Sequence, residues 1–426
     1  MDWQIFPCDG LTGTVAVPGS KSHTIRGVVA ALLSSGNSAL YAPLISADTI
    51  SCSDAAAALG AVIRKDEENR VWNITGCAGN FKTPEKVIDM GNSGTSLRII
   101  TAAAALGKEK ITFDGDESLR TRIMQGELSA LADLGAATES NNGFAPLSVC
   151  GPLHGGRTRV DGTTSQYLSA LLMALPLADG DSVLELDFLN EADYVRITLD
   201  WLKRCGIEVR YTDDLLHFEI PGKQRYNNFE RVIPADFSTA AFPLAAGVIA
   251  GKKVDILNLD FNDLQGDKKV FDFVREMGGI VKDNGKSVTV EKSQLTGRDF
   301  DLNSTPDALP IMAVLGCYAS GKTGLLNVPQ ARLKETDRID CMCRQLRKMG
   351  AEIEELPDGM IIHGGKKLHG AVVDGCKDHR IAMALSVAAL GAEGETTVIG
   401  GEACEVTYPG FAADFTAMGM TIKQEK

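Results

Sequence analysis

The stretch Ala57-Ala58-Leu59-Gly60-Ala61 predicts the end of a helix, then a glycine, then the start of a short strand. The same pattern recurs about every 72 residues along the chain, a constant spacing that indicates a repeated structural element. Its glycines are Gly60, Gly135, Gly206, Gly278, Gly350 and Gly419. A glycine after a helix favours a left-handed C-cap, because it has no Cβ to clash in that conformation.

A second series of glycines ends Ala-rich helical stretches and keeps the same spacing. Its members are Gly36, Gly107, Gly180, Gly251, Gly321 and Gly394, and we expect left-handed caps here too. Two series in phase predict six repeats, each with two helices and a strand hairpin such as Val71–Thr75 or Met360–His363. This alternation indicates an α/β fold with the Ala-rich helices inside and the polar faces of the hairpins outside.

Six repeats exceed what one hydrophobic core can hold, since chains longer than roughly 250–300 residues split into domains. We therefore expect two domains of three repeats each. The chain has 426 residues and no long flexible linker, and the phase of the repeats places the boundary near Pro221–Glu230.

The composition is that of a folded globular protein, with 44% hydrophobic and 23% charged residues. A formal net charge of −13 argues against a general nucleic-acid-binding protein, which needs a basic face. No apolar run reaches about 18 residues and the N-terminus lacks a signal-peptide pattern, so we expect a cytoplasmic protein with no membrane partner. The ten cysteines show neither C-x-x-C nor zinc spacing, so we expect free thiols, no metal and no cofactor.

Charged and small polar residues gather at the predicted starts of helices, where unpaired backbone N–H groups and the helix dipole favour anions. The first group is P-G-S-K-S at Pro18–Ser22, followed by Arg26. Lysine supplies a point charge, and arginine a bidentate fork for phosphate or carboxylate. The other groups are Gly91–Arg98, Asp114–Met124, Asp161–Met173, Asn303–Pro310, Ala331–Ile339 and Asp378–Ala384.

Each group taken alone also fits a plain structural explanation, namely a capped helix or a solvated set of ion pairs. Together they share one position in a repeated element, so we expect them to converge on one cleft between the two domains. Such a cleft would present many cations and a few carboxylates. It would suit highly anionic small molecules and acid–base chemistry that needs no metal.

Six of these motifs resemble the successive signatures of the EPSP synthase family of enolpyruvyl transferases, in the same order over nearly the whole chain. They are P-G-S-K-S, G-N-S-G-T-S-L-R, G-D-E-S-L-R-T-R-I-M, T-S-Q-Y-L-S-A-L-L-M, R-L-K-E-T-D-R and D-H-R-I-A-M-A. The resemblance implies a two-domain inside-out α/β barrel, with three βαβαββ repeats per domain and domains that close on their ligands. The first strand then belongs with the C-terminal half, so we expect domains of residues 1–17 plus 231–426 and of residues 18–230.

The resemblance also implies a reaction, the transfer of the enolpyruvyl group of phosphoenolpyruvate to the 5-hydroxyl of shikimate 3-phosphate, with release of phosphate. This step belongs to the shikimate pathway, which leads to chorismate and the aromatic amino acids. We therefore expect these two small anions as partners, and a monomeric protein.

Site residues are carried over motif by motif. The expected catalytic residues are Asp307, Glu335, Lys21 and Lys334. The residues expected to bind phosphoenolpyruvate are Lys21, Asn92, Gly94, Thr95, Arg122, Gln166, Arg338 and Arg380. Those expected to bind shikimate 3-phosphate are Lys21, Ser22, Arg26, Thr164, Ser165, Gln166, Asp307 and Lys334. Fixed cations of this kind hold two mutually repelling anions together and offset the charge that develops in the intermediate.

The chain departs from the family pattern at Glu191-Ala192, where the family usually carries Ser and a basic residue near the acceptor phosphate. A carboxylate in that position would repel a phosphate. Two smaller departures are Ile123, where proline is usual, and the absence of a lysine before Thr407-Tyr408-Pro409.

Three alternatives follow. Glu191 keeps open a transferase that acts on another cyclitol or shikimate-like acceptor. A catalytically silent anion-binding protein is disfavoured by the presence of Asp307, Lys334 and Glu335. The UDP-N-acetylglucosamine enolpyruvyl transferases carry Asn where Ser22 stands and a cysteine near the third motif, which this chain lacks.

Overall fold

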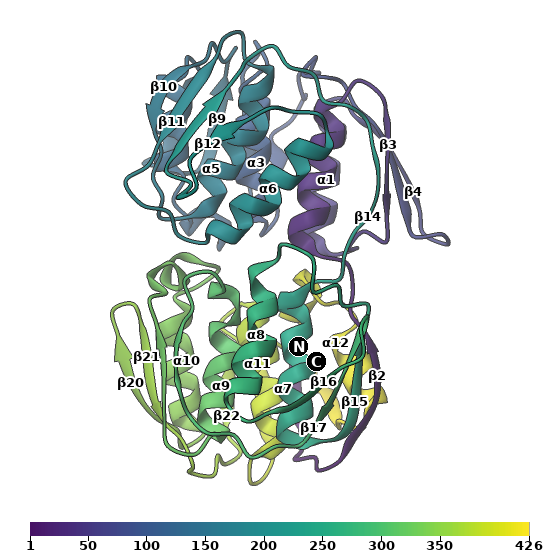
Figure 1. The fold of residues 1–426 in the computed structure, drawn as a ribbon, viewed down its shortest axis with the longest axis vertical. Coiled ribbons are helices and arrows are strands. Elements are labelled where there is room, and N and C mark those ends of the chain that lie inside the picture. Colours follow the sequence, from purple (N-terminus) through teal and green to yellow (C-terminus); the bar gives the residue numbers. More distant parts are fainter. Residues whose placement is uncertain (426) are drawn as a thin grey trace. The chain divides into compact units, whose positions relative to one another are not determined.

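The computed structural model describes residues 1–425 (Figure 1). These residues form six four-stranded sheets. The chain forms two compact units. The amino-half unit is Gly19–Ile233, and the carboxy-half unit joins Met1–Pro18 to Pro234–Lys426.

The amino-half unit contains three repeats in the order strand, helix, strand, helix, strand, strand. The first is β14 (Glu230–Val232), α1 (Lys21–Leu33), β3 (Asn37–Tyr41), α2 (Ala47–Ala58), β4 (Val62–Asp66) and β5 (Val71–Thr75). The second is β6 (Ile88–Asp89), α3 (Gly94–Ala104), β7 (Ile111–Asp114), α4 (Gln125–Asp133), β8 (Ala137–Asn141) and β9 (Phe144–Cys150). The third is β10 (Gly156–Arg159), α5 (Ser165–Ala174), β11 (Ser182–Glu185), α6 (Ala192–Arg204), β12 (Arg210–Tyr211) and β13 (His217–Ile220).

The carboxy-half unit has the same order three times. Its first repeat is β2 (Leu11–Ala16), α7 (Phe237–Ala250), β15 (Gly251–Leu257), α8 (Lys269–Glu276), β16 (Ile280–Asp283) and β17 (Ser287–Glu291). The second is β18 (Asp299–Asp301), α9 (Leu309–Tyr318), β19 (Lys322–Leu326), α10 (Arg338–Lys348), β20 (Glu352–Leu356) and β21 (Gly359–His363). The third is β22 (Val372–Asp374), α11 (His379–Ala388), β23 (Thr396–Ile399), α12 (Phe411–Ala417), β24 (Ile422–Glu425) and β1 (Asp2–Ile5).

All six sheets have the same pairing. The first two strands of each repeat are parallel and the remaining contacts are antiparallel, as in β14-β3-β5-β4. In β5, Trp72 and Ile74 are buried while Asn73 and Thr75 are exposed, which is the alternation of a strand with one face on the core. The hairpins predicted from the sequence at Val71–Thr75 and Met360–His363 are confirmed as parts of β5 and β21.

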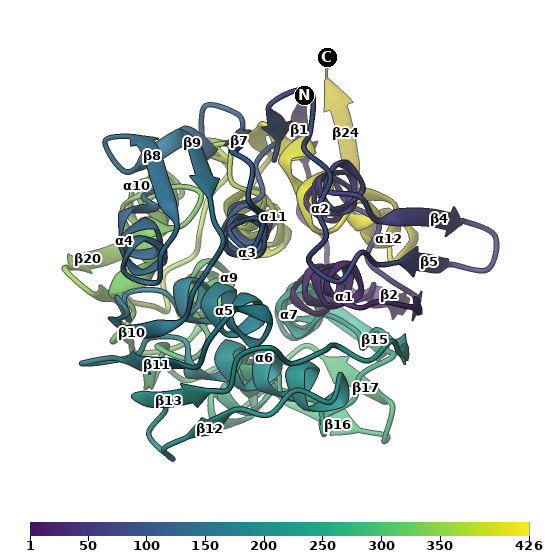
Figure 2. The same ribbon diagram turned by 90° about the horizontal axis from the view of Figure 1, so that it is seen from above.

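The first helix of each repeat lies inside its unit. In the amino-half unit α3 packs against α1 and α5, and in the carboxy-half unit α7, α9 and α11 pack against one another. Every residue of α7 is buried. Figure 2 looks along α1, α3 and α5, with the strands β8 to β13 outside them. The inner helices are rich in Ala, whose small side chain allows close packing.

The chain crosses between the units twice, and a strand lies just before each crossing. Each of these strands is the first strand of the first repeat of its unit, although it lies far along the chain from the other strands of that repeat. β2 pairs in parallel with β15 of the carboxy-half unit, and β14 pairs in parallel with β3 of the amino-half unit. The boundaries therefore follow Pro18 and Ile233. They differ by one and three residues from those expected from the sequence, because a boundary at 230 cuts through β14.

The two glycine series have different conformations. All six glycines of the first series have positive φ, between +76° and +115°, as predicted. In the second series only Gly321 and Gly394 do, so the prediction of left-handed caps is wrong for the other four. At Gly180, for example, a Cβ would lie 2.7 Å from the carbonyl oxygen of His154, so glycine is needed there for close backbone approach.

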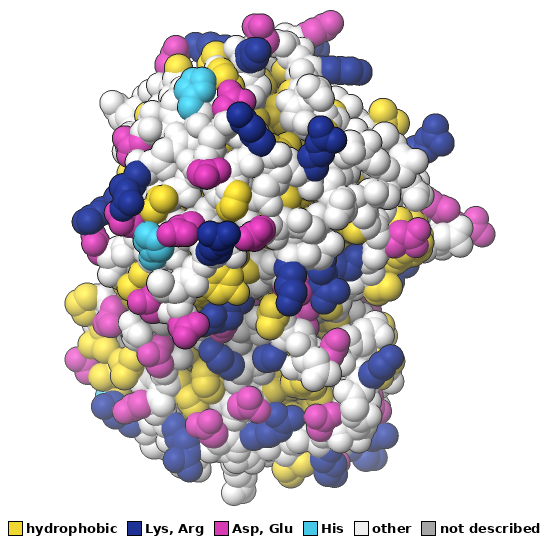
Figure 3. All heavy atoms as spheres, turned by 45° about the horizontal axis from the view of Figure 1, so that its top comes forward, with side chains coloured by type: hydrophobic (Ala, Val, Ile, Leu, Met, Phe, Trp, Pro, Cys, Tyr) yellow, Lys and Arg dark blue, Asp and Glu magenta, His cyan; other side chains and the backbone are white. Residues whose placement is uncertain are grey.

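The visible surface carries basic and acidic side chains interspersed with one another (Figure 3). Among the described residues, no helix is both long and apolar enough to cross a membrane.

Candidate active site

Most of the predicted site residues lie at or just before the N-terminal ends of helices. Five inner helices have an N-cap side chain that accepts a hydrogen bond from a first-turn N–H group. These N-caps are Ser20, Ser93, Thr164, Asp236 and Asp378. A helix end of this kind is positively polarised and has further N–H groups without intrahelical partners, so it favours anionic ligands.

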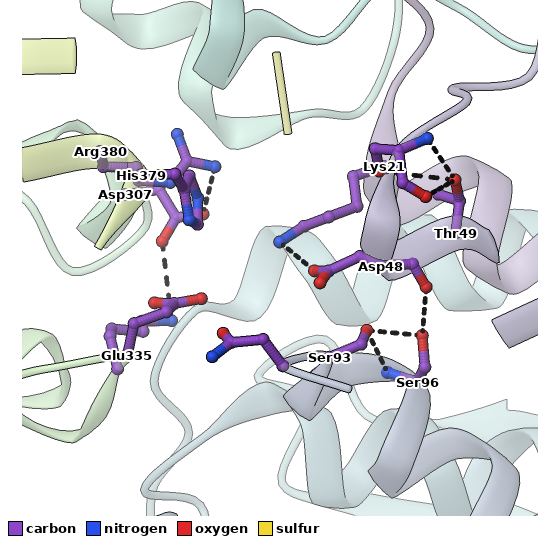
Figure 4. A network of polar contacts seen from close by, with 12 residues as sticks. Lys21, Asp48, Thr49, Ser93, Ser96, Asp307, Glu335, His379 and Arg380 are labelled. Carbon is purple, nitrogen blue, oxygen red and sulfur yellow. Dashed lines mark hydrogen bonds and ion pairs between the residues drawn. The ribbon is translucent and has the colours of Figure 1, made fainter. Parts of the chain in front are cut away.

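In the carboxy-half unit, Asp307 connects three cations. It lies in the short 3-10 helix Pro306–Ala308, which leads into α9. Its Oδ1 accepts a hydrogen bond from Nη1 of Arg338 at 2.9 Å, and its Oδ2 is 2.9 Å from Nη2 of Arg380. Lys334 Nζ lies 3.9 Å from Oδ1. Figure 4 shows Asp307 and Arg380 together with Glu335 and His379.

Arg338, the first residue of α10, is bound to three carboxylates. Its Nε donates to Oδ2 of Asp378 at 2.7 Å, and its Nη2 donates to Oε2 of Glu335 at 2.5 Å. The side chains of Arg338 and Asp378 are 1% and 0% exposed. Buried charges need paired, hydrogen-bonded partners, and the contacts with Asp307, Glu335 and Asp378 supply them.

The formal charges of this carboxy-half cluster balance. It contains three cations and three carboxylates, Lys334, Arg338, Arg380, Asp307, Glu335 and Asp378. Burial opposes ionisation of Asp307, but Arg380, Lys334 and Arg338 outweigh it and hold the pKa of this carboxyl well below its usual value. An anion that takes over one of these cations would let the pKa of Asp307 rise toward the range of a proton carrier.

In the amino-half unit, Lys21 is the first residue of α1 and pairs with Asp48. The distance from Lys21 Nζ to Asp48 Oδ2 is 3.0 Å, and the two side chains are 12% and 4% exposed. Ser96 Oγ donates to the backbone oxygen of Asp48 at 3.3 Å and accepts from Ser93 Oγ at 2.7 Å (Figure 4). These contacts join the N-terminal ends of α1, α2 and α3.

Two arginines lie over the start of α3. Arg122 donates to Oδ1 of Asn92 at 2.6 Å, and Arg98 donates to Oε1 of Gln166 at 2.6 Å. A Cβ at Gly94 would lie 3.0 Å from Arg122 Nη1 and 3.1 Å from Arg98 Nη1. Glycine at position 94 thus makes room for both guanidinium groups. Thr95, the next residue, is partly exposed.

Arg98 also donates to the backbone oxygen of Ile123 at 3.2 Å, as does the hydroxyl of Tyr167 at 2.6 Å. Arg98 therefore connects the segment after Arg122 to the start of α5. Burial raises the pKa of the nearby Glu127 well above its usual value, against the attraction of Arg98.

The first residues of α5 and its N-cap bind the side-chain carboxylate of Glu191. Ser165 donates to Oε2 of Glu191 from its hydroxyl at 2.7 Å and from its backbone N–H at 3.3 Å. The hydroxyl of Thr164 lies 3.4 Å from the same oxygen. Glu191 is 1% exposed and has φ of 58°, a left-handed conformation that is uncommon for a residue with a Cβ. Two residues predicted to bind shikimate 3-phosphate are thus bound to an internal anion.

Arg26 is buried inside the amino-half unit. Its guanidinium donates to Oγ1 of Thr198 at 2.8 Å, to Oγ of Ser169 at 3.3 Å and to the backbone oxygen of Tyr194 at 3.2 Å. It also donates to the backbone oxygen of Ser22 at 3.1 Å. Burial lowers the pKa of Arg26 to about 10. In this structure Arg26 connects α1 to α5 and α6.

The predicted residues therefore form two groups, one in each unit. Sequence reasoning missed Asp48, although Ser46 and Thr49 around it form a capping box that marks a helix start. Arg98 and Asp378 lay within the quoted motifs but received no role. The structure makes them the side chains that hold Gln166 and Arg338 in place.

Comparison with known proteins gives consistent results. The profile of the EPSP synthase (3-phosphoshikimate 1-carboxyvinyltransferase) family matches residues 7–415. The chain is 47% identical over 413 residues to the 3-phosphoshikimate 1-carboxyvinyltransferase of Acetivibrio thermocellus, covering 96% of this chain and 97% of that protein. It is 40% identical over 422 residues to the protein of that name from Methanocaldococcus jannaschii, covering 97% of each.

Solved structures share the fold. An EPSP synthase from Acinetobacter baumannii superposes with a TM-score of 0.83 at 24% identity, covering 99% of this chain and 100% of that one. The enolpyruvyl transferase NikO from Streptomyces tendae gives a TM-score of 0.80 at 17% identity, covering 99% and 98%. At these identities the likeness shows the fold alone.

Proposed function

Because the chain belongs to the EPSP synthase (3-phosphoshikimate 1-carboxyvinyltransferase) family, we propose that it transfers the enolpyruvyl group of phosphoenolpyruvate to the 5-hydroxyl of shikimate 3-phosphate. The methylene carbon of phosphoenolpyruvate gains a proton, and the acceptor hydroxyl attacks C2. The resulting tetrahedral intermediate loses phosphate and a proton to give the enolpyruvyl ether. The reaction belongs to the shikimate pathway.

The observation that carries this proposal is the carboxy-half cluster. Its two least buried carboxylates, Asp307 and Glu335, are 17% and 12% exposed, so they can meet a substrate while Arg338 holds both in place. We assign proton transfer to Asp307 and Glu335, with Lys334 beside them. A residue that takes up and returns a proton during the reaction needs a pKa that changes when the substrate binds. A bound anion would compete with Asp307 for its three cations and so raise the pKa of this carboxyl.

Arginines of both units would bind phosphoenolpyruvate. Arg380 and Arg338 would serve in the carboxy-half unit and Arg122 in the amino-half unit. Because Arg338 already donates to three carboxylates, the ligand would have to displace one of them. The remaining residues proposed for phosphoenolpyruvate are Lys21, Asn92, Gly94, Thr95 and Gln166. Holding both substrates by fixed groups lowers the entropic cost of bringing them together, and fixed cations stabilise charge on the intermediate.

For shikimate 3-phosphate we propose Lys21, Ser22, Arg26, Thr164, Ser165, Gln166, Asp307 and Lys334. Arg26 would have to leave its internal partners Thr198, Ser169 and Tyr194 to reach the phosphate. The hydroxyls and the N–H group at the start of α5 suit a phosphate, because an oxyanion accepts several hydrogen bonds at once. They are directed at Glu191 in this structure, so the phosphate would have to displace that carboxylate or share its donors.

Glu191 is also the one observation that favours a second candidate, a transferase whose acceptor lacks a phosphate at this position. A carboxylate that already satisfies Ser165 would repel a phosphate, by about 1–4 kcal/mol for unit charges 4 Å apart, between the limits of bulk water and of a protein surface. An acceptor with a neutral group there would avoid this repulsion.

One assay separates the two candidates. The purified protein is mixed with phosphoenolpyruvate and either shikimate 3-phosphate or shikimate, and phosphate release is followed. We expect release with shikimate 3-phosphate and at least about 100-fold lower kcat/KM with shikimate, because a lost charged contact costs roughly 1.5–3 kcal/mol and several are lost together. Equal or faster release with shikimate would overturn the assignment of the acceptor, and no release with either acceptor would overturn the reaction.

We further propose a cytoplasmic location and a monomeric state. All ten cysteines are free, as suits a reducing compartment. The single chain carries every residue proposed above, so the chemistry needs no second copy.

A further inference from the structure

The amino-half unit has a pocket where its inner helices end, opposite the N-terminal ends that carry the predicted site residues. Its volume is about 410 Å³, within the range of roughly 300–1,000 Å³ that is usual for small-molecule sites. Leu33 is the last residue of α1, Leu106 follows α3, and Leu177 ends the short 3-10 helix after α5. Each of the three repeats thus contributes a leucine to this pocket, which we call the helix-end pocket. Figure 2 views the three helices end-on.

Two further segments line the helix-end pocket, one that follows β5 and one that follows β13. In the first segment, the backbone N–H of Ala78 donates to the carbonyl oxygen of Ser34 at 3.0 Å. In the second, the backbone N–H of Gln224 donates to the carbonyl oxygen of Pro176 at 2.8 Å. These hydrogen bonds fix both segments to the ends of the helices. A pocket whose lining is fixed in this way loses little conformational entropy when a ligand binds.

Of the residues that line the helix-end pocket, Arg225 alone is charged. Its side chain is exposed and makes no hydrogen bond or ion pair with any residue that the structure describes. By contrast, the exposed side chains of Arg120, Arg157 and Arg210 in the same unit each pair with a carboxylate. A guanidinium group without a protein partner, next to apolar side chains, favours a ligand that carries a carboxylate.

The carboxy-half unit has an aromatic ring at the corresponding place. Tyr318 corresponds to Ala104, since each stands three residues before the second-series glycine of its repeat, and Gly391 corresponds in the same way to Leu177. The hydroxyl of Tyr318 donates to the carbonyl oxygen of Ala388. A Cβ on Gly391 would lie 2.6 Å from Cε1 of the Tyr318 ring, so the ring packs directly on this helix end. The amino-half unit has alanine in place of that tyrosine and therefore lacks a ring of its own here.

We propose that the helix-end pocket binds a small aromatic carboxylate, with its ring against Leu33, Leu106 and Leu177 and its carboxylate paired with Arg225. The leucines favour the ring because the removal of apolar surface from water stabilises the complex. Arg225 sets the charge of the ligand, since it attracts an anion, repels a cation and gains little from a neutral group.

This binding site is separate from the anion-binding residues at the helix starts. Leu33 and Lys21 are the last and first residues of α1, so they lie about 18 Å apart at a helical rise of about 1.5 Å per residue. The proposal therefore does not depend on the proposed function, and its test does not use enzyme activity.

The test is a titration of the full chain, labelled at its leucine methyl groups, with phenylacetate, followed by NMR. We expect shifts of the methyl signals of Leu33, Leu106 and Leu177 with a Kd of about 1 mM or lower, as is usual for a ligand of about ten non-hydrogen atoms. Phenylacetamide has the same shape without the charge, and we expect it to bind about three- to fivefold more weakly, the usual contribution of a solvent-exposed ion pair.

Three variants assign the binding to this pocket. Arg225→Met should weaken phenylacetate binding by about three- to fivefold and leave phenylacetamide binding unchanged, because only the acid uses the guanidinium. Arg157→Met is the matched control and should change neither, since Arg157 is an exposed arginine of the same unit that does not line the pocket. Leu106→Trp fills the pocket with a larger side chain and should abolish binding of both compounds. Lys21→Met should leave both affinities unchanged.

Several outcomes would overturn the proposal. The absence of shifts at the three leucines with phenylacetate at about 20 mM, well above the expected Kd, would exclude the site. Equal affinity for the acid and the amide, or an unchanged affinity in Arg225→Met, would exclude the carboxylate as the recognised group. Loss of binding in Lys21→Met would place the ligand at the helix starts instead. Because Arg225 is exposed, Arg225→Met should fold normally, so the result remains decisive even if Leu106→Trp does not fold.

Discussion

The two units place their charged residues at the same position of the repeat but hold them in different ways. In the carboxy-half unit, the guanidinium of Arg338 is bound to carboxylates on three sides. In the amino-half unit Lys21 pairs with one carboxylate, that of Asp48, whereas the guanidinium groups of Arg26 and Arg98 are bound to hydroxyl, amide and carbonyl oxygens. Neutral oxygens fix the position of a cation without cancelling its charge.

This difference separates two tasks. A set of cations held by neutral oxygens keeps a positive potential and suits binding of anions. A balanced set of cations and carboxylates suits proton transfer, because an incoming anion changes the pKa of the carboxylates through the cations they share. Mutations in the two units should therefore affect different kinetic constants.

The largest effect is expected for Asp307→Asn. The amide keeps the size of the side chain but cannot carry the proton, so kcat should fall by about 10²–10⁴-fold, the usual contribution of a general acid or base. Phosphate release under saturating substrates measures this. Asp301→Asn is the matched control, since Asp301 is an exposed residue of the same unit that accepts from Asn303 and Asn327.

Asp307→Asn also removes a carboxylate partner of Arg338 and Arg380, which could destabilise the fold. Thermal unfolding must therefore be recorded for the variant. A folded variant with near-normal kcat would contradict the catalytic role of Asp307.

A smaller effect of a different kind is expected for Lys21→Met. The cation at the start of α1 binds anions in both the ground state and the transition state, so KM for phosphoenolpyruvate should rise by about 10- to 100-fold, the equivalent of a charged contact of roughly 1.5–3 kcal/mol. The change in kcat should be the smaller of the two.

Lys110→Met is the control for Lys21→Met. Lys110 is exposed and pairs with Glu139 in the same unit, and its loss should change neither constant. A fall in kcat with KM unchanged would mean that Lys21 acts in the chemical step, and the division of tasks between the units would then fail.

The smallest effect, and the only gain, is expected for Glu191→Gln. The substitution removes the negative charge next to Ser165, so KM for shikimate 3-phosphate should fall by about 5- to 10-fold, corresponding to roughly 1 kcal/mol of relieved repulsion. The control is Glu185→Gln, a residue of the same unit that pairs with Arg157. A higher KM in Glu191→Gln would show that this carboxylate supports the acceptor site.

Much of the fold was predictable from the sequence, because the repeat leaves a periodic trace. Gly60 and its five equivalents need positive φ, and a backbone requirement of that kind restricts the residue at one position of each repeat. The clusters at helix starts were predictable for a similar reason, since N-caps and anion-binding residues occupy fixed places relative to the helix.

Contacts between residues far apart in the sequence were harder to predict. Asp48 pairs with Lys21 across 27 positions of the chain, and Asp378 binds Arg338 across 40. The sequence contains both members of each pair but no signal that joins them. The place of β14 in the amino-half unit also depends on contacts between distant segments, because β14 pairs with β3 near the start of that unit. The sequence gives no sign of this pairing, so the expected boundary lay within β14.

The sequence by itself determined the six repeats, the α/β class and the residue types at the helix starts, because each depends on local backbone geometry and on hydrophobic periodicity. Only the tertiary structure decided which charges are paired. In the folded protein Arg338 binds three carboxylates, Arg26 lies in the core, and Ser165 donates to Glu191. The physical reason is that burial makes an unpaired charge costly, so each buried group is bound to whatever partner the packing brings within reach.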